Sequence, residues 1–300
     1  MTFSSAIAVL LLLATGVKSA AFTLTLMPDA VTTLNARCLD GSPGGYYWRS
    51  AANPDDASKF ALILNGGGWC YDAEDCVGRS HTDLGSSKGW ASTIADDGIT
   101  SSDPAFNPTF AGFNVAYLYY CDGTSYSGNL SEPLVVNGTT LHFRGFSILN
   151  AFIQHLQQHR NLNSASHVVL SGHSAGGLGT YMHTDHVRSL LPSNVVYGAM
   201  PDAGFFLDAP NTKGEYVYTD KMRTIATISQ SISDDGCMAA HPSDGWRCIM
   251  AEFVFPYITS DLHIIQSSYD SFQLGNVLQL SCIPSEKNCS SADLAAFQVS

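Results

Sequence analysis

The chain has few basic residues. Across 300 residues, 14 Lys and Arg stand against 26 Asp and Glu, which gives a net charge of −12. The sequence contains no run of Lys or Arg that could bind along a phosphate backbone. The composition therefore argues against partners such as nucleic acid or an anionic membrane surface. Charged residues make up only 13% of the chain and aromatic residues 11%, a balance that argues against disorder. There is also no internal repeat and no low-complexity tract, so we expect one folded domain with a substantial core.

Long apolar runs are also scarce, and the longest lies at the N-terminus. The stretch Ala6–Ala14 is followed by small residues and is short for a membrane span. It predicts a signal peptide over residues 1–20, with cleavage near Ser19, and no membrane association after its removal. Because no Lys or Arg precedes the stretch, an uncleaved anchor is the alternative.

The cysteines show none of the C-x-x-C spacings of a zinc site, which disfavours a structural metal. All eight follow the apolar N-terminal stretch, and an even number is expected in an oxidising compartment. We expect local bridges between Cys70 and Cys76 and between Cys282 and Cys289, and a longer one between Cys38 and Cys121, although the sequence does not decide the connectivity. Three sequons, which would be glycosylation sites in a secreted protein, begin at Asn129, Asn137 and Asn288.

Apolar patterning predicts an α/β fold. Two short strands are expected within residues 23–48, and continuous apolar runs predict buried strands at residues 60–64, 113–120, 167–171, 195–199 and 262–266. Helices are expected over residues 143–156 and 175–190. Strands alternating with helices indicate a single domain with a mostly parallel sheet and helices on both faces. The polar stretch from 72 to 110 is long for a connection and is expected to shape a site.

The pentapeptide Gly172-His173-Ser174-Ala175-Gly176 lies where the 167–171 strand meets the following helix. This G-x-S-x-G pattern is typical of a nucleophile elbow, in which a sharp strand-to-helix turn exposes one Ser. The pattern therefore predicts Ser174 as a nucleophile and the amide of Ala175 as an oxyanion donor. An ordinary turn with an inert Ser is the alternative.

An activated Ser needs further oxyanion donors, an acid and a base. The donors are expected from Gly66-Gly67-Gly68-Trp69, because this loop leaves an upstream buried strand. Asp270 is favoured as the acid because it follows a late strand, and Asp202 competes with it. The base is missing from its usual place, since no His follows Asp270. His183 and His186 lie one turn apart, but a solvated helix face explains them better than a metal site.

Five ordered motifs together resemble the pectin acetylesterase family, which also contains the secreted Notum-type carboxylesterases. These motifs are Leu64-Asn65-Gly66-Gly67-Gly68-Trp69-Cys70, Tyr120-Cys121-Asp122-Gly123-Thr124, Gly172-His173-Ser174-Ala175-Gly176-Gly177, Asp202-Ala203-Gly204-Phe205-Phe206 and Tyr269-Asp270. The resemblance implies an extracellular α/β-hydrolase that removes acyl groups from oxygen without metal or cofactor. It implies Ser174 as the nucleophile, Asp270 as the acid, and the amides of Gly68, Trp69 and Ala175 as the oxyanion hole.

The chain departs from the family pattern at two places. Asn65 stands where family members usually carry Glu, which removes a charge beside the glycine loop. The family's His lies in a motif downstream of Ser300. We therefore expect residues 21–300 to be an α/β-hydrolase domain truncated at its C-terminus, the alternative being a protein that has lost its base.

The resulting hypothesis is a secreted serine esterase of the cell wall. Its substrate would be an acetylated polysaccharide such as pectin, and its reaction would pass through an acetyl-enzyme on Ser174. One alternative is a Notum-like lipid or protein carboxylesterase, which needs a deep apolar pocket near Trp69. Another is a catalytically inactive glycan-binding protein. The sequence does not indicate an oligomeric state.

Overall fold

The computed structural model describes residues 21–280, 282, 290 and 291. The expected signal peptide, Cys289 and the Asn288 sequon lie outside these residues. Within them, no helix has both the length and the apolar character needed to cross a membrane. The chain forms a mixed seven-stranded sheet in the order β4-β1-β2-β5-β3-β8-β9 and a separate hairpin, β6-β7.

The central strands are parallel, as the apolar runs predict. β3 (Lys59–Leu64) pairs in parallel with β5 (Asn114–Leu118) and with β8 (His167–His173), and β8 pairs in parallel with β9 (Val196–Asp202). The antiparallel part comprises β1 (Phe22–Leu26), β2 (Gly45–Arg49) and the two-residue β4 (Thr93–Ile94). The small hairpin consists of β6 (Leu134–Val136) and β7 (Thr139–Leu141).

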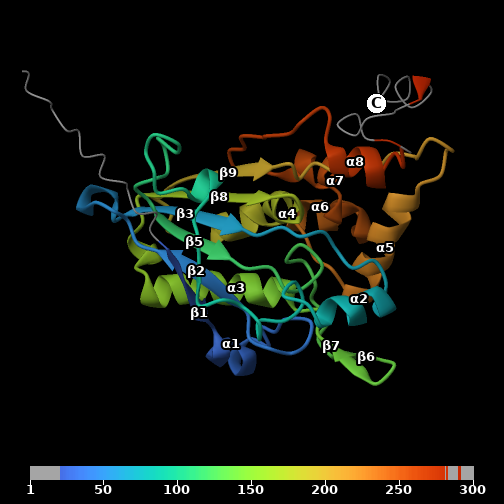
Figure 1. The fold of residues 1–300 in the computed structure, drawn as a ribbon, viewed down its shortest axis with the longest axis horizontal. Coiled ribbons are helices and arrows are strands. Elements are labelled where there is room, and N and C mark those ends of the chain that lie inside the picture. The colour runs from blue at the N-terminus through green and yellow to red at the C-terminus, as the bar shows by residue number, and fades with distance from the viewer. Residues whose placement is uncertain (1–20, 281, 283–289, 292–300) are drawn as a thin grey trace, which may run out of the picture.

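Two long helices cover one face of this sheet (Figure 1). They are α3 (Gly145–His159) and α4 (Ala175–Ser189), whose Leu149 and Leu178 share one core with Leu62 and Leu170 of the strands. On the other face, Ile94, Ile99 and Phe113 of a mainly irregular segment pack on Ile63. Thus, in the described part of the chain, this segment provides the second layer.

The remaining helices are short or peripheral. Two of them flank the antiparallel part and the β6-β7 hairpin: α1 (Pro28–Thr33) and α2 (Ala73–Ser80) (Figure 1). Four others lie toward the carboxyl ends of the parallel strands: α5 (Val217–Ser229), α6 (Asp235–Ala240), α7 (Ala251–Val254) and α8 (Ser271–Asn276).

The expectation of a core strand at residues 262–266 is wrong. This segment forms only two isolated parallel bridges with β9, Ala199 with Leu262 and Asp202 with Ile265. Ile264 and Ile265 are each 41% exposed, so the segment lies at an edge rather than inside the sheet. An apolar run of this length does not reveal whether a further element covers it.

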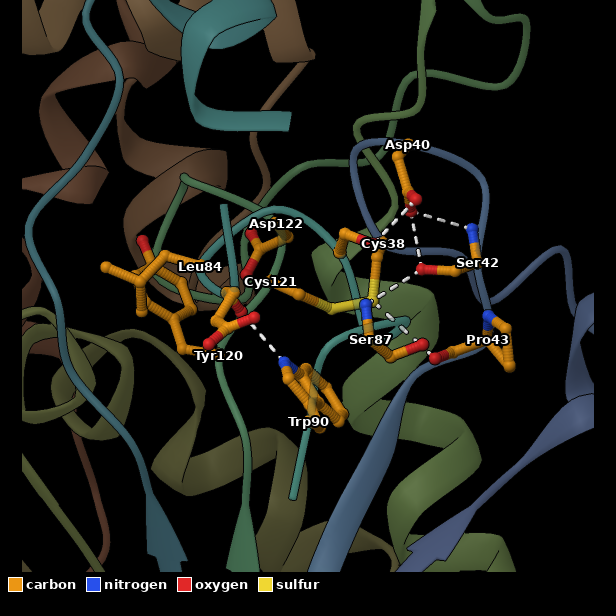
Figure 2. Close-up of a disulfide and its surroundings, with 12 residues drawn as sticks. Cys38, Asp40, Ser42, Pro43, Leu84, Ser87, Trp90, Tyr120, Cys121 and Asp122 are labelled. Carbon is orange, nitrogen blue, oxygen red and sulfur yellow. Dashed lines mark hydrogen bonds between the residues drawn. A yellow bond between two sulfur atoms is a disulfide. The ribbon is translucent and has the colours of Figure 1, made fainter. Parts of the chain in front are cut away.

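Three disulfides join described residues. Cys38–Cys121 and Cys70–Cys76 confirm two expected pairings, and the sequence analysis did not predict Cys237–Cys248. The Cys38–Cys121 bridge ties the segment before β2 to the loop after β5 (Figure 2). The loop after β5 in turn contacts the end of the glycine loop, where the Cys70 N–H donates to the Gly123 carbonyl oxygen at 3.4 Å.

Candidate active site

Ser174 occupies a sharp turn between β8 and α4. Its backbone has φ 57° and ψ −123°, a strained conformation for a residue with a side chain. The turn is held by a hydrogen bond from the Ser174 amide to the Asp202 carbonyl oxygen at 2.9 Å. This geometry confirms the expected strand-turn-helix arrangement, and the catalytic role of Ser174 stays a prediction.

Glycines let three backbone segments meet at this turn. A methyl group on Gly176 would overlap the carbonyl oxygen of Leu64 at the end of β3, and one on Gly177 would lie 2.5 Å from the Asp202 carbonyl oxygen. A methyl group on Gly66 would lie 3.2 Å from Ser174 Cβ and would overlap the His173 carbonyl oxygen. The glycine loop after β3 and the elbow after β8 are therefore in direct backbone contact.

The glycine loop adopts backbone conformations that favour glycine. Gly67 and Gly68 have φ of 146° and 65°, which residues with side chains rarely adopt. Trp69 is buried, and its indole N–H donates to Ser125 Oγ at 2.8 Å. The structure thus places Gly66, at the start of this loop, against Ser174, and the oxyanion roles of Gly68, Trp69 and Ala175 stay predictions.

Asn65, where the family usually carries Glu, takes part in holding the start of this loop. Its side-chain amide lies 2.5 Å from the Tyr117 hydroxyl of β5, and its backbone N–H donates to the Leu118 carbonyl oxygen at 3.0 Å. The neutral side chain therefore contributes a hydrogen bond to the neighbouring strand.

Asp270 directly precedes α8 and caps its N-terminus. One carboxylate oxygen accepts from the Gln273 N–H at 3.0 Å and the other from the Gln266 side-chain amide at 3.1 Å. The Gln266 side chain also accepts from the Phe205 N–H at 3.0 Å, which links the Asp270 segment to the loop after β9. Phe272, two residues further on, contacts Trp69 with a 5.8 Å separation of ring centroids. These contacts place the Asp270 segment against Trp69, at the end of the glycine loop.

Asp202, the competing acid, has another partner. Its carboxylate lies 3.0 Å from His173 Nδ1, on the residue that precedes Ser174. Both side chains are largely exposed, with 70% of the His173 and 43% of the Asp202 side chain accessible. Their pairing leaves Asp270 as the better candidate for orienting a base.

Among residues 21–280, no hydrogen bond joins the Ser174 hydroxyl to a histidine. His241 pairs with Asp244, and His263 lies exposed on the edge segment beside β9. His183 is fully buried in α4, where burial lowers its pKa to about 3, so it stays neutral. The described histidines therefore do not supply a visible base, and no metal-binding cluster occurs among those residues.

An aromatic cluster lies beside the glycine loop. It consists of Trp69, Phe206, Tyr218 and Phe272. The Trp69 ring meets Phe206 at 5.0 Å and Tyr218 at 6.0 Å, in edge-to-face arrangements. Both Phe206 and Tyr218 are 1% exposed, and burial keeps the pKa of the Tyr218 hydroxyl far above its usual value. Sequence analysis missed this cluster because its members come from four separate segments.

Comparison with known protein families agrees with these features. A family described as "Pectinacetylesterase" matches residues 16–300. The chain belongs to this family. It is 33% identical over 246 residues to pectin acetylesterase 5 of Arabidopsis thaliana, an alignment covering 81% of this chain and 56% of that protein.

Notum-type relatives are more distant. The human palmitoleoyl-protein carboxylesterase NOTUM is 29% identical over 79% of this chain and 49% of its own length. The solved structure of the Wnt deacylase Notum from Drosophila superposes with a TM-score of 0.81, at 24% identity, over 93% of this chain and 79% of that one. That match supports the fold. The chain spans about half the length of several curated relatives, 56% of the Arabidopsis protein and 49% of the human one.

Proposed function

We propose that the protein is a secreted carboxylesterase that removes O-acetyl groups from a cell-wall polysaccharide such as pectin. In this proposal, Ser174 attacks the acetyl carbonyl carbon and forms an acetyl-enzyme, releasing the sugar hydroxyl. The amides of Gly68, Trp69 and Ala175 stabilise the oxyanion, and water then releases acetate. Asp270 orients the histidine base that this mechanism requires.

Membership of the pectinacetylesterase family supports the reaction class, and the packing of Trp69 supports a short acyl group. The Trp69 ring contacts Phe206, Tyr218 and Phe272, and three of the four rings are almost fully buried. With the acyl group against Trp69, as we propose, a long acyl chain would have to displace these rings, whereas an acetyl group needs little space. The aromatic cluster is the single observation that favours acetyl over fatty acyl esters.

Secretion is supported by the apolar N-terminal stretch and by the disulfides, which persist in oxidising compartments. The boundaries that we propose are a signal peptide over residues 1–20 and an esterase domain from residue 21. The cell wall is proposed because the substrate is a wall polysaccharide.

The test compares esters of increasing chain length with purified protein. We expect p-nitrophenyl acetate to be hydrolysed faster than the octanoate, and acetate to be released from acetylated pectin. Ser174→Ala should lose at least about a thousandfold in kcat, whereas Ser189→Ala, on the exposed end of the same helix, should keep it.

Two results would contradict the proposal. Faster cleavage of the octanoate or of a palmitoleoyl peptide would favour the Notum-like alternative, which is supported by the relatives at 29% identity. If acetylated pectin binds but neither it nor any ester is cleaved, and Ser174→Ala changes nothing, the protein is an inactive glycan-binding relative.

A further inference from the structure

Arg79, at the end of α2, contacts the outer side of the glycine loop. Its Nη2 donates to the Gly67 carbonyl oxygen at 3.0 Å and, at the outer limit of a hydrogen bond, to the Gly68 carbonyl oxygen at 3.5 Å. No other side chain of the described residues donates to either carbonyl. We infer that Arg79 is a positioning residue that aims the Gly68 and Trp69 amides at the oxyanion. This inference rests on the proposed esterase function.

The planar peptide bond couples each of these carbonyls to the N–H of the next residue. In a trans peptide, the C=O of one residue points opposite to the N–H of the next. A donor on the Gly67 carbonyl therefore fixes the direction of the Gly68 N–H, and a donor on the Gly68 carbonyl fixes that of the Trp69 N–H. These are the two loop amides assigned to the oxyanion hole.

The loop needs such a donor because glycines rotate easily. Gly67 and Gly68 have positive φ and no side chain to hinder rotation of the peptide between them. The Asn65 N–H is held by the Leu118 carbonyl oxygen and the Trp69 indole by Ser125, so the loop is anchored at both ends. Arg79 supplies a side-chain hydrogen-bond donor in the middle of the loop.

Arg79 is itself held from several sides. Its Nε donates to the Leu84 carbonyl oxygen at 3.1 Å, and its guanidinium lies 5.0 Å from the centre of the Tyr120 ring. Figure 2 shows Leu84 and Tyr120 on the same side of the Cys38–Cys121 disulfide. The Cys70–Cys76 bridge additionally ties α2 to the residue that follows Trp69. The guanidinium is therefore a fixed donor.

The charge of Arg79 adds to its geometry. A charged donor polarises the peptide group to which it binds, and this makes the N–H at the other end of that group a stronger donor. The effect should be larger in the transition state than in the bound ester, because negative charge on the substrate oxygen develops only there.

The test uses Arg79→Met and Arg79→Lys, with Arg160→Met as a matched control. Arg160 also lies 5.0 Å from an aromatic ring, that of Trp48, but at the antiparallel end of the sheet. For hydrolysis of p-nitrophenyl acetate, we expect Arg79→Met to lower kcat by about tenfold to a hundredfold with KM within threefold, less than the loss of a direct oxyanion donor. Arg79→Lys should recover part of kcat, and Arg160→Met should leave it unchanged.

Two further readouts separate positioning from a purely structural role. The affinity of a boronic acid, which forms a tetrahedral adduct with an active Ser, should fall in Arg79→Met by the same factor as kcat/KM. A crystal structure of Arg79→Met should show the Gly67-Gly68 peptide rotated. An unrotated peptide with unchanged kcat and boronic acid affinity would overturn the inference.

Failure of the proposed function is distinguishable from failure of this inference. If the unmodified protein hydrolyses esters no faster than Ser174→Ala, the esterase proposal fails. The crystal structure of Arg79→Met then decides whether Arg79 orients the loop. If Arg79→Met does not fold, the structure of Arg79→Lys serves, because a Lys reaching only one carbonyl should leave the other peptide displaced.

Discussion

The nucleophile half and the acid half of the candidate site are built in different ways. Ser174 lies at the end of a strand that is paired on both sides, by β3 and β9, and backbone segments contact one another around it. Asp270 follows an edge segment with two isolated bridges, and the neighbouring Tyr269 is 64% exposed. The position of Ser174 is thus set by the sheet, whereas that of Asp270 depends on side-chain contacts.

The largest effect expected from this comparison concerns the two competing acids. In the proposed esterase, Asp270→Asn should lower kcat by about a thousandfold or more, because a triad carboxylate holds and stabilises the charged base. Asp202→Asn should cost less than about tenfold, since Asp202 pairs with the exposed His173. Steady-state kinetics on an acetyl ester measures both. Similar losses in the two variants, or a larger loss in Asp202→Asn, would reverse the assignment.

The second effect tests the close packing of the nucleophile half. Gly176→Ala would push a methyl group into the backbone of Leu64, so we expect a loss of about 3 kcal/mol or more in the free energy of unfolding. Gly78→Ala, in α2 with no neighbour within 4 Å of the added methyl group, should instead stabilise the protein by about 0.5–1 kcal/mol. Urea denaturation gives both values. A tolerated Gly176→Ala would show that the turn can relax.

The same contrast explains what the sequence could predict. The elbow and the glycine loop are local patterns in which spacing, small residues and a preceding apolar run all indicate one structure. Their contact across β3 and β8 follows from parallel pairing, since the carboxyl ends of parallel strands meet at one edge. The strands and helices that carry Ser174, Gly68 and Trp69 are therefore largely confirmed.

The parts that escaped prediction depend on contacts between distant segments. The segment at residues 262–266 has the composition of a core strand, but its exposure depends on what covers it. The contact of Arg79 with Gly67 joins α2 to a loop twelve residues earlier in the chain, and the aromatic cluster joins four segments. No spacing rule indicates these contacts, because their geometry is set only when the chain is folded.

The smallest effect that we expect is on the pH dependence of stability, and it comes from two carboxylates, one in the nucleophile half of the site and one in the acid half. Asp122, in the loop that supports Trp69, is fully buried, and burial raises its pKa to about 6 despite hydrogen bonds from Thr124 and Tyr126. Asp185 of α4 anchors the start of the acid segment. Burial raises its pKa, but hydrogen bonds from Ser260 and Thr259 outweigh this and hold the pKa below the usual value.

These shifts have opposite consequences for stability. The native state keeps a proton on Asp122 that the unfolded state releases above its ordinary pKa of 3.8, so the contribution of Asp122 declines as pH rises from about 4 to about 6. The free energy of unfolding of Asp122→Asn relative to the unmodified protein should therefore rise over this range, by on the order of 2 to 3 kcal/mol. For Asp185, the stabilising contribution is present above pH 3.8 and is lost as pH falls through its lowered pKa.

Urea denaturation of Asp122→Asn and Asp185→Asn between pH 3 and pH 7 measures both differences. We expect the deficit of Asp185→Asn to be constant at neutral pH and to shrink only in acid, while the difference for Asp122→Asn changes between pH 4 and 6. A flat difference for Asp122→Asn would mean that its carboxylate is charged in the folded protein. Below pH 6 as well as above it, the loop beneath Trp69 would then hold a buried negative charge near Arg79, and the Arg79 guanidinium would have to stabilise that charge as well as the glycine loop.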